Sequence, residues 1–119
     1  MNKKCPVFVA AGLIGKKWSL EILVQLCKNK LKPKRYSEIR RNLNNVNPRS
    51  LSIRLKNLEK SGLIKKKISA KTFPIKSEYS LTESGKDFIK VIKEIKEWAI
   101  KWKNHNALCK GIDCVDCKN

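Results

Sequence analysis

The chain has 119 residues, enough for one domain with a modest core, and its 28 Lys and Arg against 10 Asp and Glu give a formal net charge of +18. So large an excess predicts a polyanionic partner. With one histidine, no phosphate-binding glycine loop and no paired carboxylates, the composition argues against an enzyme and against a small-molecule substrate. No secretory signal or apolar run of membrane length occurs, so we expect a cytoplasmic protein that does not engage a membrane.

Two apolar segments come first in the chain. Residues 6–15, PVFVAAGLIG, are expected to form a buried helix, and residues 18–27 a second one rich in Leu, Ile and Val. Both are expected to pack against the back of the module that follows. Cys27 falls on the apolar side of the second helix, which predicts a buried and unreactive thiol.

The middle of the chain has the signals of a helix-turn-helix. Residues 48–61 are expected to form one helix, because Asn47 suits the N-cap, Pro48 the first helical position and Gly62 the C-terminal cap. A shorter helix beginning near Ser37 and the turn NNVN precede it. In such a unit the second helix can enter the major groove of DNA.

The two faces of this second helix differ in chemistry. An apolar stripe at helical spacing is formed by Leu51, Leu55 and Leu58. The opposite face is basic and rich in hydrogen-bonding groups, as a surface that contacts DNA requires. The candidate DNA-contacting residues of the two helices are Ser37, Arg40, Arg49, Ser50, Ile53, Arg54 and Asn57.

A basic hairpin is predicted to follow. Residues 63–69 and 76–81 have the pattern of two strands, with a loop between them. The lysine run 65–67 is explained either as a solvated edge that discourages aggregation or as a wing that contacts phosphates. Its position next to a helix-turn-helix favours the wing, and Lys71 and Lys76 are candidate DNA contacts there.

The positive charge is concentrated on this module. Residues 28–56 contain ten basic side chains and one acidic side chain, and residues 60–76 contain six basic and no acidic ones. Residues 77–119 contain eight basic and seven acidic side chains. The field is therefore directed at the helix-turn-helix and the wing, where double-stranded DNA would bind with a steep dependence on salt.

A long amphipathic helix is predicted from Thr82, a suitable N-cap, to about Lys103. Its apolar seam is formed by Phe88, Val91, Ile92, Ile95, Trp98, Ala99 and Trp102. This seam is larger than a small domain needs and favours a homodimer. We therefore expect a mainly α fold with a small β-hairpin, a winged helix-turn-helix with N- and C-terminal dimerisation helices over residues 1–104, and a cysteine-bearing tail over residues 105–119.

From about residue 5 to residue 103 the chain resembles the HxlR-type winged-helix transcriptional regulators, a group near the MarR regulators. The resemblance rests on Cys5-Pro6, Gly15-Lys16-Lys17-Trp18, Arg35-Tyr36-Ser37-Glu38-Ile39-Arg40, Asn47-Pro48-Arg49, Arg54-Leu55 and Glu78-Tyr79-Ser80-Leu81-Thr82-Glu83-Ser84-Gly85. It implies a homodimeric DNA-binding regulator with terminal helices at the dimer interface, the helix from Pro48 as recognition helix and the hairpin as wing. It also implies a redox-sensing role for Cys5, because relatives often sense oxidants or electrophiles with a cysteine at this position.

One residue departs from the pattern of the resembled family. Ile53 stands where relatives often have a polar residue. An isoleucine exposed there can contact thymine methyl groups. The operator preference of relatives is therefore not transferred to this chain.

The tail is a candidate metal or redox site. Cys109, Cys114 and Cys117 have the spacing C-x4-C-x2-C, and with Cys5 as a remote fourth thiol they match the pattern of plant-type two-iron clusters. The alternatives are zinc held by the tail thiolates with His105 or Cys5, a reversible disulfide without metal, or a solvated tail without a role. An iron-sulfur cluster is favoured over zinc.

The sequence therefore predicts a dimeric, sequence-specific DNA-binding transcriptional regulator, redox- or metal-responsive through Cys5 and the tail cysteines. The alternative is a sequence-tolerant architectural DNA- or RNA-binding protein with a structural zinc tail. The two functions differ in whether substitution of a base-reading residue costs discrimination or only affinity.

Overall fold

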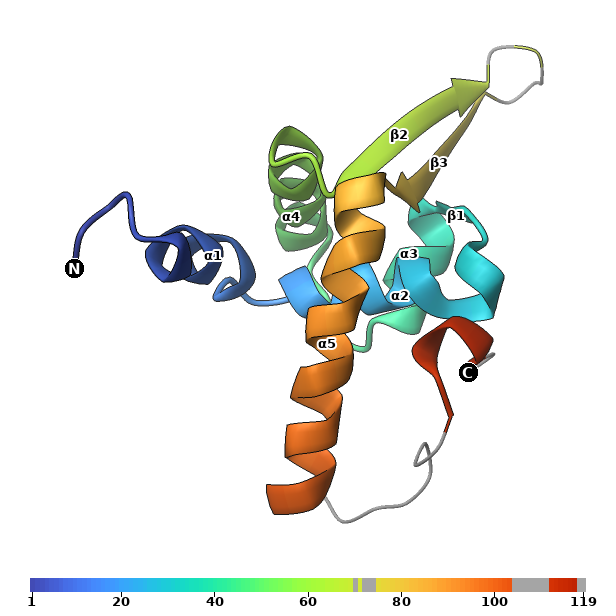
Figure 1. The fold of residues 1–119 in the computed structure, drawn as a ribbon. Coiled ribbons are helices and arrows are strands. Elements are labelled where there is room, and N and C mark those ends of the chain that lie inside the picture. The colour runs from blue at the N-terminus through green and yellow to red at the C-terminus, as the bar shows by residue number, and fades with distance from the viewer. Residues whose placement is uncertain (70, 72–74, 104–111, 118–119) are drawn as a thin grey trace.

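The computed structural model describes residues 1–69, 71, 75–103 and 112–117. The elements are α1 (Pro6–Ile14), α2 (Ser19–Leu31), β1 (Lys34–Arg35), α3 (Tyr36–Asn42), α4 (Pro48–Lys60), β2 (Ile64–Ser69), β3 (Lys76–Leu81), α5 (Glu83–Trp102) and the 3₁₀ turn η2 (Cys114–Asp116). This order confirms the predicted winged helix-turn-helix (Figure 1). No helix within the described ranges has the length and apolarity that crossing a bilayer demands.

The sheet has one strand more than the sequence predicted. The expected hairpin is β2–β3, with Ile64 opposite Leu81, and β1 pairs antiparallel with the other side of β3, where Lys34 lies opposite Tyr79. The strand order is therefore β1-β3-β2. A strand of two residues is too short to show the alternation of apolar and polar residues from which strands are predicted, so the pattern missed it.

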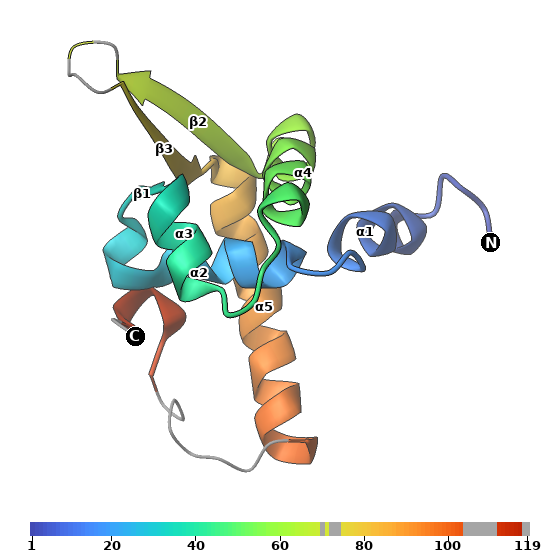
Figure 2. The same ribbon diagram turned by 180° about the vertical axis from the view of Figure 1, so that it is seen from behind.

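The core lies between α2, the helix-turn-helix, the sheet and the first half of α5. Fully buried side chains include Ile22, Leu23 and Leu26 of α2 and the leucine stripe of α4. Ile92 is the most distant buried position along α5, and the helix continues beyond the core as a long rod (Figure 1, Figure 2). The helix-turn-helix and the wing therefore rest on one shared apolar base.

The prediction that the first helix is buried is wrong for the single chain. No residue of α1 is buried, and Val7 and Val9 are 65% and 61% exposed. The helix projects from the body on the side opposite the C-terminal segment (Figure 1, Figure 2). Apolar composition predicts burial but does not say whether the covering surface belongs to the same chain.

Regular helical geometry in α2 ends at Cys27, the residue at which the sequence predicted the helix to end. Lys28 has extended ψ, and the next three residues all have positive φ: Asn29 at 54°, Lys30 at 59° and Leu31 at 62°. Side chains disfavour this left-handed region, and asparagine tolerates it best. The connection from α2 to β1 is therefore a strained turn.

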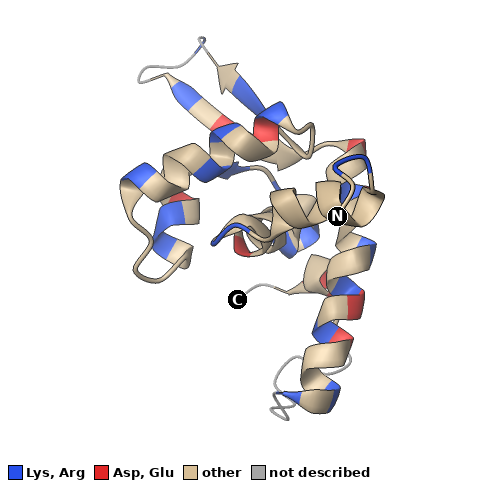
Figure 3. Cartoon of the chain, turned by 90° about the vertical axis from the view of Figure 1, so that its left-hand side faces the viewer, with Lys and Arg blue, Asp and Glu red and all other residues tan. Residues whose placement is uncertain are grey.

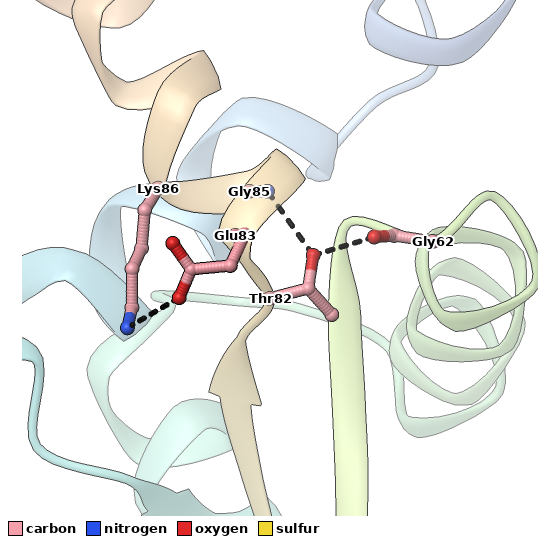
Figure 4. Close-up of polar contacts among 5 residues, drawn as sticks. All are labelled: Gly62, Thr82, Glu83, Gly85 and Lys86. Carbon is pink, nitrogen blue, oxygen red and sulfur yellow. Dashed lines mark hydrogen bonds and ion pairs between the residues drawn. The ribbon is translucent and has the colours of Figure 1, made fainter.

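A compact junction fixes α5 to the end of the helix-turn-helix (Figure 4). The Thr82 hydroxyl donates to the carbonyl of Gly62 and accepts from the Gly85 amide at 3.1 Å, so the predicted N-cap is confirmed. Gly62, at φ 83°, ends α4 in a Schellman motif, in which the Leu63 amide bonds the Leu58 carbonyl at 3.1 Å. The end of α4, the start of the wing and the start of α5 are thus held together by hydrogen bonds at one junction.

Candidate nucleic-acid interface

The recognition helix α4 is positioned by local capping. The Asn47 side chain accepts from the amides of Arg49 and Ser50, at 2.8 Å and 3.4 Å. The Tyr36 hydroxyl, at the start of α3, donates to the carbonyl of Pro48 at 3.2 Å and so ties the two helices together. The helix is therefore held at its N-terminal end, the end that enters the groove in helix-turn-helix proteins.

The outward face of α4 agrees with the prediction. Leu51, Leu55 and Leu58 are buried, whereas Arg49 and Ile53 are exposed. Ser50 is half-buried beside them. The structure therefore leaves a guanidinium and an apolar side chain free on one face, where they can meet a guanine edge and a thymine methyl group.

The predicted contacts in α3 follow Tyr36, whose hydroxyl bonds the start of α4. Ser37 and Arg40 are both exposed, and Ile39 anchors the helix in the core. Both side chains are therefore accessible to a partner, as contacts from the first helix of such a motif require.

Arg54 and Asn57 lie on a different flank of α4. They line a cleft of about 780 Å³ between α4 and α1, together with Val9, Leu13 and Lys16. Arg54 is half-buried there. The predicted residues thus divide into an outward group and a flank that faces the first helix, a division that the leucine stripe alone did not reveal.

The wing presents lysines on both of its faces. Lys65, Lys66 and Lys67 of β2 are all exposed, and the Lys66 ammonium lies 5.9 Å from the centre of the Tyr79 ring. Lys71 is exposed beyond the end of β2, and Lys76, the first residue of β3, is half-buried. The lysine run 65–67 was not among the candidate DNA contacts of the wing, yet it is exposed, as Lys71 is.

The distribution of charge in space follows its distribution in the sequence. Figure 3 shows Lys and Arg along the wing strands and on the helix-turn-helix, whereas α5 carries both signs. Two of its ion pairs, Lys86 with Glu83 at 3.4 Å and Lys90 with Asp87 at 3.2 Å, lie within one turn of the helix. The excess of positive charge is therefore concentrated on the wing and the helix-turn-helix.

Comparison with known proteins decides the family. The model of an HxlR-like helix-turn-helix matches residues 13–107. The chain belongs to the HxlR family. Its members are HTH-type transcriptional regulators and not enzymes, in agreement with the expectation from composition.

Relatives of this HxlR-family chain cover most of its length. It is 38% identical over 102 residues to the HTH-type transcriptional regulator YvaP of Bacillus subtilis, which is 85% of this chain and 91% of YvaP. A MarR-family regulator from Porphyromonas gingivalis W83 superposes with a TM-score of 0.77 and 31% identity over 86% of this chain and 96% of that chain. The reduced form of YodB from B. subtilis gives a TM-score of 0.72 and 30% identity over 86% and 97%.

The three half-buried cysteines that the structure describes in this HxlR-family chain lie on two sides of the molecule. Cys5 is half-buried at the N-cap of α1, and its carbonyl accepts from the Val9 amide at 3.1 Å. Cys114 and Cys117, also half-buried, lie on the far side beside α2 (Figure 1). Cys109 and His105 lie outside the described residues.

The predicted metal ligands that the structure describes, Cys5, Cys114 and Cys117, are not brought together. Among the described residues, no three His, Cys, Asp or Glu side chains are grouped so that they could hold a metal ion. Helix α1, which Cys5 precedes as N-cap, and the turn η2, which begins at Cys114, lie on opposite sides of the body of the protein (Figure 1, Figure 2). A ligand set that includes both Cys5 and the tail thiols would therefore need Cys5 of a second chain. The spacing of cysteines in the sequence could not reveal this, because it does not report the distance between segments that are remote in the chain.

Cys27 is fully buried in the core, so the predicted burial is confirmed. The pKa of its thiol is raised from 9.0 to about 11, chiefly by burial and to a smaller extent by Cys114 and Asp113, against a lowering effect of Lys34. Burial also lowers the pKa of Lys34, whose ammonium donates to the carbonyl of Lys28 at 3.2 Å. At neutral pH Cys27 is protonated and unreactive.

The raised pKa of Cys27 makes stability depend on alkaline pH. Below pH 9 the thiol is protonated in both states, and its contribution to stability is complete. Between pH 9 and 11 only the unfolded chain ionises, so the free energy of unfolding falls by about 2 to 3 kcal/mol in total. Urea denaturation across this range is expected to show that Cys27→Ala removes this fall. Lys34 is present in both proteins and cannot account for a difference between them. Equal slopes of unfolding free energy against pH for the two proteins would therefore contradict the assignment of this fall to Cys27.

Proposed function

We propose that this protein is a homodimeric, sequence-specific transcriptional regulator that binds double-stranded operator DNA through α4 and the wing. The observation that carries the proposal is the division of α4 into a buried leucine stripe and an exposed face with Arg49 and Ile53. A nonspecific binder needs only positive charge, whereas this face combines a bidentate donor with an apolar group. Ser37 and Arg40 contact phosphates beside it, and Lys71 and Lys76 contact the flanking backbone.

The dimer rests on the apolar surface that the single chain leaves uncovered. Beyond Ile92, the exposed residues Ile95, Trp98 and Trp102 continue the seam of α5, and the two tryptophans are 56% and 62% exposed. The uncovered apolar helix α1 adds to this surface. Burial of both in a second copy would remove them from water and place two α4 helices on one duplex.

We propose that the regulator responds to thiol chemistry at Cys5. YodB has been solved in reduced, diamide-treated and quinone-bound forms, which supports a thiol response in a relative that is 30% identical. Cys5 lies at the start of the uncovered helix α1, so a modification there would act on the proposed dimer surface. Cys5→Ser should abolish the response to diamide and leave operator binding intact.

A metal at the tail lacks a demonstrated ligand set. The described residues supply two thiols at C-x2-C spacing, Cys114 and Cys117, whereas an iron-sulfur cluster or a structural zinc takes four ligands. We therefore propose that the regulator responds through its cysteine thiols without a bound metal. Iron, sulfide and zinc analysis of protein purified without oxygen tests this choice: visible absorption with iron and sulfide would establish a cluster, and zinc in colourless protein would establish a structural tail.

Selection from random-sequence duplexes tests the specificity. A regulator of this kind enriches one motif over successive rounds, and its affinity for that motif exceeds its affinity for random DNA by about 10³-fold or more. No enrichment, or equal binding to RNA, would favour the architectural protein.

Arg49→Ala is expected to lower affinity for the selected operator by about 1 to 3 kcal/mol, because the exposed guanidinium is placed to pair with a guanine edge. Binding to random DNA should change much less. Lys71→Ala is the matched control: it should weaken binding on every sequence and lower the salt slope by about one. Titration at several salt concentrations measures both, and an equal loss for Arg49→Ala on operator and random DNA would remove it from base reading.

A further inference from the structure

The C-terminal segment 112–117 docks onto its own chain at the end of α2. The amide of Asn29 donates to the carbonyl of Cys117 at 2.9 Å, and Lys30 pairs with Asp116. On the α5 side, the ammonium of Lys96 donates to the carbonyl of Ile112. Cys114 and Val115 pack against the hydrophobic core between these polar contacts. The segment is therefore attached at both ends and in the middle.

The docking site is the strained turn that joins α2 to β1. Asn29, Lys30 and Leu31 are consecutive residues in the left-handed region, and none of them is glycine. Such a run persists only where surrounding contacts hold it. Two of its three residues contact the segment directly, through the Asn29 amide and the Lys30 ammonium. Undocking would remove these contacts and allow the turn to relax.

A continuous series of contacts leads from this turn to the recognition helix. The buried ammonium of Lys34, in β1, donates to the carbonyl of Lys28 at 3.2 Å, and β1 pairs with β3 of the wing. The next element after β1 is α3, whose Tyr36 hydroxyl bonds the carbonyl of Pro48 at the start of α4. A change in the turn would therefore be transmitted both to the wing and to the start of α4.

The segment contains a thiol that can act as the trigger. Cys114 is half-buried, so reagents can reach it, and its side chain packs against the core that includes the fully buried Cys27. Protein interiors have no spare room for an added group of several atoms. An adduct on Cys114 would therefore compete with the packing of the docked segment against the core.

We propose that residues 112–117 form a thiol-controlled latch on the α2–β1 turn, and that an adduct on Cys114 releases the latch and shifts the helix-turn-helix. The effect on operator binding rests on the proposed function, whereas docking and release do not. The reagent class is an α,β-unsaturated carbonyl. The Cys114 thiolate adds to the carbon–carbon double bond, a sulfur–carbon bond forms, the other carbon takes up a proton, and no oxidant is needed.

The test uses N-ethylmaleimide on full-length variants that differ in their accessible thiol. In one protein Cys5, Cys109 and Cys117 are replaced by serine, which leaves Cys114 with the buried Cys27. In the matched control Cys109, Cys114 and Cys117 are replaced, which leaves Cys5 on the far side with the same buried Cys27. Mass spectrometry locates the adduct, and NMR hydrogen exchange follows the Asn29 amide and the amides of residues 34–42.

An adduct on Cys114 is expected to speed hydrogen exchange at the Asn29 amide by at least about tenfold and to speed exchange at the amides of residues 34–42. Cys27 should then also react with the reagent, more slowly than Cys114. The adduct on Cys5 should leave the Asn29 amide unchanged. Unchanged exchange at Asn29 after labelling of Cys114 would overturn the latch. Faster exchange at Asn29 with no change in residues 34–42 would overturn its link to the helix-turn-helix.

The same proteins separate this proposal from the proposed function. On the selected operator, the Cys114 adduct is expected to change affinity by at least about fivefold. A further variant, with Cys5, Cys109, Cys114 and Cys117 all replaced by serine, should not respond to the reagent. If no operator can be selected, the proposed function fails, and the exchange results still decide whether the latch exists.

Discussion

Replacing Trp98 and Trp102 together with aspartate is expected to convert the protein from dimer to monomer and to lower operator affinity by at least about a hundredfold. Both side chains lie beyond the core of their own chain and are more than half exposed, so the change removes apolar contact area without unfolding the domain. Two linked helix-turn-helix units bind DNA far more tightly than one, because the second unit binds at a high effective concentration once the first is bound.

Sedimentation velocity and operator titration measure the two parts of this result. The matched control is Lys90→Gln with Lys93→Gln on the same helix, which lowers the net charge by the same two units and leaves the tryptophans in place. The control should stay dimeric and lose only the affinity that its charge accounts for. A double aspartate variant that remains dimeric would exclude this end of α5 as the interface.

Gly85→Ala is expected to lower the free energy of unfolding by about 3 kcal/mol. A Cβ at position 85 would lie 2.1 Å from the carbonyl oxygen of Leu63 and 3.0 Å from the Leu81 side chain. The first of these atoms is backbone at the start of the wing, so it cannot move aside without displacing β2. The cost arises from forced separation of α5 and the wing at the junction held by Thr82.

Urea denaturation of the wild-type protein, Gly85→Ala and Ser84→Ala measures this cost. Ser84 is the exposed neighbour in the same helical turn, so its replacement should change stability by much less. Equal stability of the two variants would mean that the close approach to Leu63 is not maintained in solution.

Local signals predicted the recognition helix and the wing well. Asn47, Pro48 and Gly62 act on the residues beside them, and the structure places α4 within one residue of the predicted bounds. The Thr82 cap and the two wing strands were predicted for the same reason. Boundaries that depend on neighbouring residues can be derived from a single sequence.

Features that depend on distant segments were not predictable. The burial of α1 depends on which chain covers it, and β1 exists only because β3 lies beside it. The three left-handed residues after Cys27 include no glycine, so nothing local marked a turn held by the tail. The placement of Arg54 and Asn57 on the cleft with α1 likewise depends on the position of another helix.

Under the proposed function, two copies of this chain read a symmetric operator through α4. Hydroxyl-radical footprinting of the purified dimer on the selected duplex tests it most directly. We expect two protected half-sites related by inverted symmetry, with centres about 10 base pairs or a multiple of that apart, and loss of both in the double aspartate variant. Protection without a repeat, spreading evenly along any duplex, would contradict it.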